Sequence, residues 1–481
     1  MIAFKTKISY GITAVADQCL FYLYGTFFMF FLTTVAGVSP GAAGIISAVG
    51  AIWDAFMAVV AGHISDNAHT RYGKRKPFVM SFAIPMAATT ALMFSAFEMS
   101  YIAKIIYFTV VTMLYWSFFP LFFIPFLAWG AELTEDYAER TTLRSFAYVG
   151  NTVGMAIGTL LPSVMVAFFA ERGFSEADSW QKTMMLVALA VGAVLLFGPM
   201  GIKSESNALS AEEKQKMREE RSICKGNGSS LISGLKPMLS DFSEILKLKT
   251  LIYILSASIL YLMASTIFAA DRMYFFTYSA QLSAKTISAL MAVATFSGVL
   301  LLPVVTATRK TIDKKIQYTA GMFACAIVML ICRFVYPNSV AASAIVMFAF
   351  GVSNMLYWQL LPAMLYDVCE VDELVDGKQR QGTIVSLQSL VESVSEAVGM
   401  LTIGFVLELA GFAAEAEAQP ASAIFWVSNC FTVIPVIFMA ASSVLIFIYP
   451  ITSKNFAKVV AAVRAQREGE KQDLNEFKEL L

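Results

Sequence analysis

Charge is scarce in this chain of 481 residues. Only 15% of its residues are charged, whereas 58% are hydrophobic, and the mean hydropathy is +0.67. A soluble domain of this length has too little interior to bury so much apolar surface. Lys and Arg together number 35, as do Asp and Glu, so the net charge is zero and we expect no nucleic-acid partner.

Groups that enzymes use are scarce as well. The sequence has two histidines, His63 and His69, and lacks a Ser/His/Asp set, an HExxH motif and a phosphate-binding loop. None of the six cysteines shows metal-site or CxxC spacing, and most lie in apolar runs, where packing explains them. We therefore expect no enzymatic activity, no cofactor and no metal. The first apolar run is too long for a cleavable signal peptide.

Long apolar runs are what the sequence has in abundance. They reach roughly 20 residues or more, which is the length of a membrane-spanning helix and unlike the short alternating segments of outer-membrane barrels. Lipid requires every backbone polar group to be satisfied internally. The sequence therefore predicts an all-α protein in a lipid bilayer, with twelve spanning helices at 9–36, 40–65, 77–97, 102–131, 145–170, 183–201, 250–276, 286–307, 317–336, 340–367, 383–410 and 424–450.

Basic residues predict the orientation of these helices. If both termini face the cytoplasm, all but six of the 35 Lys and Arg residues fall in cytoplasmic segments. The six exceptions are Lys104, Arg172, Lys182, Arg272, Lys285 and Arg333. This bias follows the positive-inside rule. We expect a multi-pass protein of the bacterial inner membrane with both termini in the cytoplasm.

A polar stretch divides the chain into two halves. Residues 202–249 are predicted to form a cytoplasmic connector between six-helix bundles at 1–201 and 250–450, with a tail at 451–481 that forms a solvated helix or is frayed. In both halves a Pro-bearing helix end enters an acidic loop that closes with Arg, from Pro125 to Arg140 and from Pro362 to Arg380. Two related halves in one orientation indicate a carrier whose substrate site lies between them near the midplane.

Three loops resemble those of a known family. They are the segment from Ile52-Trp53-Asp54-Ala55 through Asp66 to Pro77, the segment 132–141, and the segment 367–380. Together they resemble the glycoside–pentoside–hexuronide:cation symporters, the melibiose permease-like carriers of the major facilitator superfamily. The resemblance implies the major facilitator fold and import of a sugar or glycoside, coupled to H⁺ or Na⁺, by alternating access.

The same loops mix acids with bases at the cytoplasmic mouth. Such groups can form ion pairs that hold an inner gate shut and break when it opens. The predicted gate residues are Asp66, Arg71, Arg75, Glu132, Asp136, Arg140, Asp372 and Arg380. The alternative interpretation is topology charge combined with helix capping.

Ionisable side chains at bilayer depth are candidate site residues, because each costs at least a few kcal/mol. Asp17 and Asp54 lie in the first two helices. Glu392 and Glu396 lie one turn apart on one face of the eleventh helix, and Gln388 continues that stripe. We expect Glu392, Glu396 and Gln388 to contact substrate.

The resemblance gives three residues individual roles. It implies that Asp17 holds sugar hydroxyls, that Trp358 covers the apolar face of the sugar ring, and that Asp54 binds the coupling cation or proton. The alternatives are an interhelical hydrogen bond for Asp17, core packing for Trp358, and a structural pair with a basic side chain for Asp54.

The sequence departs from the melibiose branch at both sites. Ala58, Met57, Phe123 and Pro120 stand where that branch has further cation ligands, and Ala147 and Ser393 replace the Arg and Lys of its sugar site. A single carboxylate is a poor cage for sodium, whereas a proton needs only one. We expect proton coupling through Asp54, with sodium coupling or uncoupled diffusion as alternatives.

These losses also bear on the substrate. The pocket lacks the family's cationic pair and carries Glu392 and Glu396 instead, which favours a neutral glycoside or polyol over a cationic or amphipathic compound or a hexuronide. A non-transporting sensor on the same fold is a further alternative, since fold does not fix function.

Overall fold

The computed structural model describes residues 3–67, 75–133, 137–202, 244–308, 311–336, 339–377, 380–413, 416, 418–467 and 477. Within these residues, twelve helical segments are long and apolar enough to cross a membrane. The prediction of an all-α membrane protein with twelve spanning helices is confirmed. Most of the predicted connector, from 203 to 243, lies outside the described residues.

The first half contains six spans, several of which differ from their predicted bounds. Its elements are α1 (Phe4–Thr34), α2 (Pro40–Asn67), α3 (Lys76–Ser81), α4 (Ala83–Met93), α5 (Tyr101–Glu132), α6 (Tyr137–Ala170), α7 (Glu176–Phe197) and the 3₁₀ turn η1 (Gly198–Gly201). The third span is broken at Phe82 into α3 and α4. The sixth begins at Glu176, ahead of the predicted 183, because Ser175 caps it by accepting from the Asp178 N–H.

The second half repeats this plan. Its elements are α10 (Lys249–Tyr274), the π-helical turn η3 (Phe275–Ser279), α11 (Ala284–Thr308), α12 (Lys314–Val335), α13 (Val340–Asp376), α14 (Gln381–Leu409), α15 (Ala421–Phe431), α16 (Val433–Ile448) and α17 (Ser453–Arg467). α13 continues well past the predicted end at 367 and stops at Gly377, whose φ of +67° suits a left-handed helix end. α17 forms part of the predicted tail and packs against α13.

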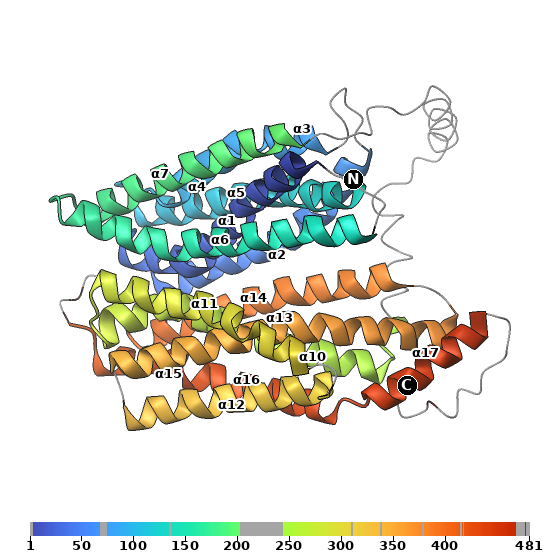
Figure 1. Ribbon diagram of the computed structural model, residues 1–481. Coiled ribbons are helices and arrows are strands. Elements are labelled where there is room, and N and C mark those ends of the chain that lie inside the picture. Colours follow the sequence, from blue (N-terminus) through green and yellow to red (C-terminus); the bar gives the residue numbers. More distant parts are fainter. Residues whose placement is uncertain are drawn as a thin grey trace, which may run out of the picture.

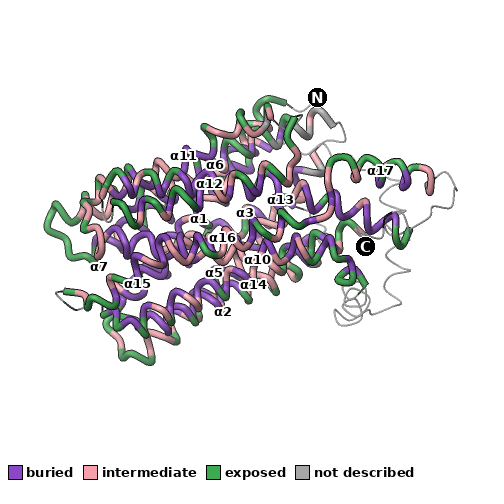
Figure 2. The backbone as a smooth tube through the Cα atoms, turned by 90° about the horizontal axis from the view of Figure 1, so that it is seen from below, coloured by how far each residue is buried: buried purple, intermediate pink, exposed green. Residues whose placement is uncertain are grey.

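The two halves lie against each other, and both chain ends lie on the same side of the molecule (Figure 1). We call this the terminal side and the other the opposite side. α1 begins on the terminal side and α2 begins on the opposite side. The halves meet where α2 packs on α14, α6 on α11 and α1 on α10. Figure 2 shows buried backbone running through the centre of the bundle, with exposed turns at both ends.

Small residues bring α2 and α14 into backbone contact on the opposite side. A Cβ placed on Gly44 would lie 2.9 Å from the Met400 carbonyl oxygen and 3.1 Å from the Cα of Gly404. One to two turns further along α2, Ala48 and Ala51 pack against α14. The two helices can come this close because neither glycine carries a side chain.

Hydrogen bonds between the halves lie on the opposite side as well. The Tyr274 hydroxyl lies 3.0 Å from the Met29 carbonyl oxygen and 2.6 Å from the Thr33 hydroxyl. The backbone N–H of Gly41, at the start of α2, donates to a Glu408 carboxylate oxygen at 2.5 Å. The structure therefore shows the halves closed against each other on the side away from the chain ends.

Candidate substrate and cation site

One face of α1 is open over part of its length. Val15, Gln18, Tyr22 and Gly25 are half-buried and recur at helical spacing, and Ile12 and Phe21 beside them are exposed. A Cβ added to Gly25 would meet no atom within 4 Å, so space lies beside α1 at this point. From Thr26 to Thr33 every residue is buried. The open face therefore ends at Gly25.

Two other helices lose their exposure at a matching point. On α2, Ala51 is buried whereas Asp54 is half-buried. On α14, Glu396 is half-buried whereas Gly399 is buried. On each of these three helices a half-buried position is followed by a buried one toward the opposite side. We call the region between these half-buried faces the central space, and on the opposite side it ends where α2 packs on α14 and α1 on α10.

Asp54, Glu392 and Glu396 lie on the parts of α2 and α14 that border this space. Asp54 of α2 and Glu396 of α14 come from different halves and lie close enough to interact through their charges. Glu396 likewise interacts with Glu392, one turn away on α14. In the described part of the chain no group of His, Cys, Asp and Glu has the form of a metal site. The arrangement places carboxylates of both halves near the interface of α2 and α14.

Gln388 joins the acids to a polar network in the second half. Its Nε2 lies 2.7 Å from the Ser258 hydroxyl, 3.3 Å from the Tyr357 hydroxyl and 3.1 Å from Glu392 Oε1. The Ser258 and Tyr357 hydroxyls are 2.5 Å apart. Gln388 Oε1 is buried and has no partner in the described residues. The network therefore has an acceptor left for a ligand hydroxyl.

The two remaining predicted sugar-binding residues are Asp17 on α1 and Trp358 on α13, next to Tyr357. Asp17 is 3% exposed and accepts a hydrogen bond from Gln18 at 3.0 Å. Trp358 is 48% exposed, and its ring stands edge-on to that of Tyr357 with centroids 5.2 Å apart. Such exposure argues against core packing for Trp358. The sugar-binding roles of both residues stay predictions.

Sequence reasoning missed several residues around the space. Ser258, Tyr357, Tyr22 and Gly25 are uncharged, so no cost of burying charge singles them out. One signal was available, because Tyr357 directly precedes the predicted Trp358. Tyr22 is half-buried on α1, on the same face as Gln18 and Gly25.

Among the predicted gate residues, Arg380 is the best defined. It binds Asp372 through two nitrogens, at 2.7 and 3.1 Å, and also reaches Glu244 at 2.8 Å and Asp376 at 3.0 Å. The hydrogen bonds that Arg380 donates to Asp372 are the main cause that raises the pKa of the Arg380 guanidinium above its ordinary value. Asp372 and Asp376 belong to α13 of the second half, and Glu244 lies at the end of the connector.

Among the predicted gate residues of the first half, the structure describes the side chain of Arg75 alone. Arg75 is 8% exposed and donates to the Ser65 hydroxyl at 2.7 Å, again within its own half. Asp66, Glu132 and Arg140 lie in α2, α5 and α6, but their side chains are not among those described. Arg71 and Asp136 lie outside the described residues. A gate that pairs the two halves therefore stays a prediction.

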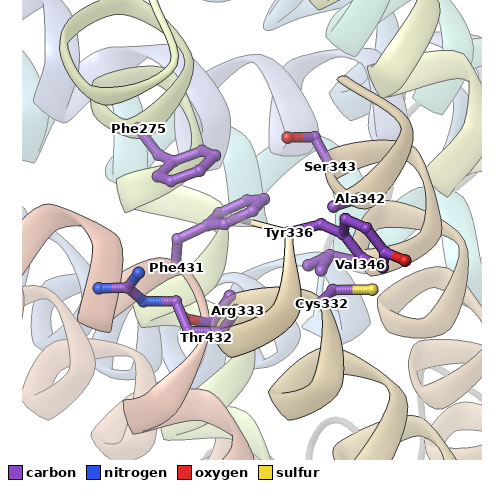
Figure 3. A pocket seen from close by; sticks show the side chains of 9 residues that line it. All are labelled: Phe275, Cys332, Arg333, Tyr336, Ala342, Ser343, Val346, Phe431 and Thr432. Atoms are coloured by element: carbon purple, nitrogen blue, oxygen red, sulfur yellow. The ribbon is translucent and has the colours of Figure 1, made fainter. Parts of the chain in front are cut away.

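A separate pocket lies in the second half, away from the predicted residues (Figure 3). Its lining comes from η3, α12, α13 and α15 with the residues that follow them, and consists of Phe275, Cys332, Arg333, Tyr336, Ala342, Ser343, Val346, Phe431 and Thr432. The rings of Phe275 and Phe431 stack at 4.1 Å. Since the pocket contains none of the acids between the halves, we do not assign the substrate site to it.

The comparisons with known proteins agree with this geometry. A family model described as MFS/sugar transport protein matches residues 9–453. The chain belongs to this family, the glycoside–pentoside–hexuronide:cation symporters of the major facilitator superfamily. It is a membrane transporter and not an enzyme.

Named relatives and a solved structure are similar to the chain over nearly its whole length. The isoprimeverose transporter of Lactiplantibacillus pentosus is 23% identical over 94% of this chain and 89% of its own. The glucuronide carrier protein homolog of Escherichia coli is 23% identical over 99% of both chains. The inward open structure of the E. coli xylose transporter XylE has a TM-score of 0.60 at 12% identity, covering 95% of this chain and 98% of that one. This structural likeness confirms the fold.

Proposed function

We propose that this transporter imports a sugar or glycoside together with a proton, by alternating access. The observation that carries the proposal is that Asp54 and Glu396, from opposite halves, lie close enough to interact through their charges on the parts of α2 and α14 that border the central space. A proton or cation bound there contacts both moving bodies at once. Its binding can therefore favour one arrangement of the halves over the other.

The terminal side is taken as the cytoplasmic face of the inner membrane, in line with the positive-inside distribution. The state described is then closed to the outside. The ion pairs of Arg380 lie at the inner mouth, with Asp372 and Asp376 of α13 and with Glu244 at the end of the connector. We propose that they exchange partners with bases of the first half when the inner mouth closes.

The proton is favoured over sodium by the surroundings of Asp54. Sodium needs several oxygen ligands. The positions one turn beyond Asp54 on α2 are Met57 and Ala58, whose side chains offer no oxygen. The names of the relatives support a sugar as substrate, since one is named for isoprimeverose and another for a glucuronide. Asp17, Gln388 and the exposed ring of Trp358 supply the contacts that sugar hydroxyls and a sugar face require.

The test is uptake of labelled glycosides by proteoliposomes with an imposed proton gradient and no sodium. Asp54→Asn separates coupling from translocation, and Asp17→Asn serves as the matched carboxylate variant. We expect wild-type protein to accumulate a glycoside above equilibrium. Asp54→Asn should lose accumulation but keep exchange of internal for external sugar, while Asp17→Asn should lose both. A several-fold acceleration by external sodium at fixed pH would refute the choice of ion.

A further inference from the structure

We propose that the separate pocket of the second half (Figure 3) is a binding site for the head group of an anionic phospholipid, with Arg333 holding the lipid phosphate. The pocket contains none of the acids between the halves. Lipid binding there depends neither on the substrate nor on the coupling ion proposed for the carrier. With both chain ends in the cytoplasm, the lipid belongs to the outer leaflet.

The pocket opens at the membrane surface on the opposite side. α12 is the ninth span of a chain whose first span begins on the terminal side, so α12 ends on the opposite side. Arg333 lies in its last turn, and Ser343 lies in the first turn of the next span, α13. Tyr336, at the end of α12, also lines the pocket and is 63% exposed. Because tyrosine side chains gather where lipid meets water, the mouth of the pocket lies at the level of the head groups.

The helix faces beside the pocket are suited to acyl chains. Ile327, Ile331 and Phe334 are exposed and recur three or four residues apart, so they form one apolar face of α12. Val340 and Ile345 of α13 are exposed as well. Apolar side chains exposed on a spanning helix contact lipid tails. A lipid whose tails lie on this face of α12 has its head group at the end of the helix, where the pocket opens.

Arg333 gives the pocket a positive charge that needs a partner. Its Nε is buried and has no hydrogen-bond partner in the described residues. The nine described residues that line the pocket include no Asp or Glu. A charge at bilayer depth is costly, whereas a guanidinium can bind two phosphate oxygens through parallel hydrogen bonds. Basic pockets between spanning helices bind lipid head groups for the same reason.

The size of the pocket favours a ligand that it holds only in part. Its volume is about 260 Å³ with the open mouth included. Sites that enclose a whole small molecule have volumes of about 300–1,000 Å³. A phospholipid needs room here only for its phosphate and the adjoining atoms, because its tails stay in the bilayer.

The other polar groups favour an anionic head group over a zwitterionic one. The Thr432 hydroxyl donates to the Ser428 carbonyl oxygen at 2.7 Å, so its lone pairs are left to accept. Ser343, which is also buried, adds a second hydroxyl to the lining. Both can bind the glycerol hydroxyls of phosphatidylglycerol. The ammonium of phosphatidylethanolamine would instead lie near Arg333, with no acid in the described lining to accept it.

The competing explanation is that Arg333 serves only the helix end. A basic side chain in the last turn is stabilised by the helix dipole whether or not a ligand binds. Arg333→Lys keeps that charge and loses the planar two-point geometry, whereas Arg333→Gln removes the charge and keeps a donor. Arg172→Gln is the matched control, because Arg172 is an exposed base just after α6, on the same side and outside the pocket.

The experiment measures lipid binding by native mass spectrometry of the full chain, delipidated in detergent and titrated with phosphatidylglycerol or phosphatidylethanolamine. For wild-type protein we expect the first phosphatidylglycerol to bind at least about fivefold more tightly than the first phosphatidylethanolamine. Arg333→Gln should raise the Kd of that first phosphatidylglycerol about tenfold or more and remove the preference. Arg333→Lys should raise this Kd less, and Arg172→Gln should change it less than about twofold.

A second arm separates a lipid from a free phosphate compound. Inorganic phosphate and glycerol 3-phosphate carry the same charged group without acyl chains. We expect neither to displace phosphatidylglycerol at equal concentration, because neither gains from contact with the apolar faces of α12 and α13. Displacement by either would show that the pocket takes a soluble phosphate compound, and would overturn the choice of a lipid.

Three further results would overturn the proposal. They are equal Kd values for the two lipids in wild-type protein, an unchanged Kd in Arg333→Gln, and an equal loss in Arg172→Gln, which would indicate unspecific attraction to surface charge. An unfolding temperature near that of wild type, measured without lipid, shows that Arg333→Gln is folded. If it is not, Ser343→Leu decides the question, because it fills the pocket and leaves Arg333 in place. An unchanged Kd for phosphatidylglycerol in Ser343→Leu would then refute binding in the pocket.

Discussion

The contact between Gly44 and Gly404 offers a sharp test of how the halves close. In Gly44→Ala the new Cβ would lie 2.9 Å from the Met400 carbonyl oxygen and 3.1 Å from the Cα of Gly404. Both obstacles are backbone atoms, so no side-chain rotation relieves the clash. In a state that opens on the opposite side, α2 and α14 separate and the methyl group meets no obstacle.

The expected shift in population between the closed and the opened arrangement follows from the cost of overpacking. Forcing an extra methyl group into a tight contact costs about 1–3 kcal/mol. Because about 1.4 kcal/mol is a factor of ten in an equilibrium, the closed arrangement should lose about 5- to 150-fold in population relative to the opened one. Gly25→Ala is the matched control, since its Cβ would meet nothing within 4 Å. Both variants replace a helical Gly by Ala and gain the same helix propensity, so this gain cancels when their labelling rates are compared.

The assay is the labelling rate of one cysteine in the central space by a membrane-impermeant maleimide. Ser393→Cys is a suitable reporter, because Ser393 is half-buried on α14 one turn from Ala397 and the exchange is nearly isosteric. The other cysteines are first replaced. In right-side-out vesicles, Gly44→Ala should speed labelling from outside and slow it from inside relative to Gly25→Ala. Equal rates for the two variants would refute the reasoning.

Three further predictions use the same measurements or thermal unfolding. Tyr274→Phe removes hydrogen bonds to Met29 and Thr33, each worth about 0.5–1.5 kcal/mol. It should therefore also speed maleimide labelling of the reporter cysteine from outside. An unchanged labelling rate would show that these hydrogen bonds do not hold the two halves closed on the opposite side. Glu408→Gln should have a smaller effect in the same direction, because it keeps the contact with Gly41 but loses the favourable charge at the start of α2; an effect larger than that of Tyr274→Phe would contradict this. Arg380→Gln should lower the unfolding temperature in detergent by several degrees, because losing one partner of a buried ion pair costs about 3–5 kcal/mol. Because the pKa of Arg380 is raised on folding, its stabilising charge is fully present below the unfolded pKa and is lost only as pH rises through the higher folded pKa. The difference in unfolding temperature between wild type and Arg380→Gln should therefore be constant between about pH 6 and 9. A fall of this difference within that range would count against the ion pair.

The sequence predicted the spanning helices but placed several of their ends wrongly. Apolar runs mark only the part of a helix that lies in lipid. The polar first turns of α6 and the polar last turns of α13 were therefore not predicted. The breaks at Phe82 and Thr432 did have a signal in the sequence. Pro85 and Pro435 cannot donate to Ser81 and Phe431, which are the last residues of α3 and α15.

Proline alone was still not enough to predict those breaks. Pro120, Pro125 and Pro362 stand inside helices that continue through them. Whether a helix breaks depends on how neighbouring helices compensate for the missing hydrogen bond, and one sequence does not show that.

The candidate site divides in a similar way. Asp54, Glu392 and Glu396 could be selected because acids at bilayer depth are costly. The proximity of Asp54 to Glu396 could not be predicted. It depends on the register between α2 and α14, which the contact of Gly44 with Gly404 sets. The uncharged partners Ser258 and Tyr357 became visible only through their hydrogen bonds to Gln388.

The most direct test of coupled transport is to measure proton movement evoked by the substrate. Proteoliposomes containing a pH-sensitive dye are given a glycoside, without sodium and without an imposed gradient. The account predicts that adding the transported glycoside acidifies the lumen, and that Asp54→Asn abolishes this acidification while sugar exchange continues. Uptake of the glycoside without acidification, or acidification that persists in Asp54→Asn, would contradict it.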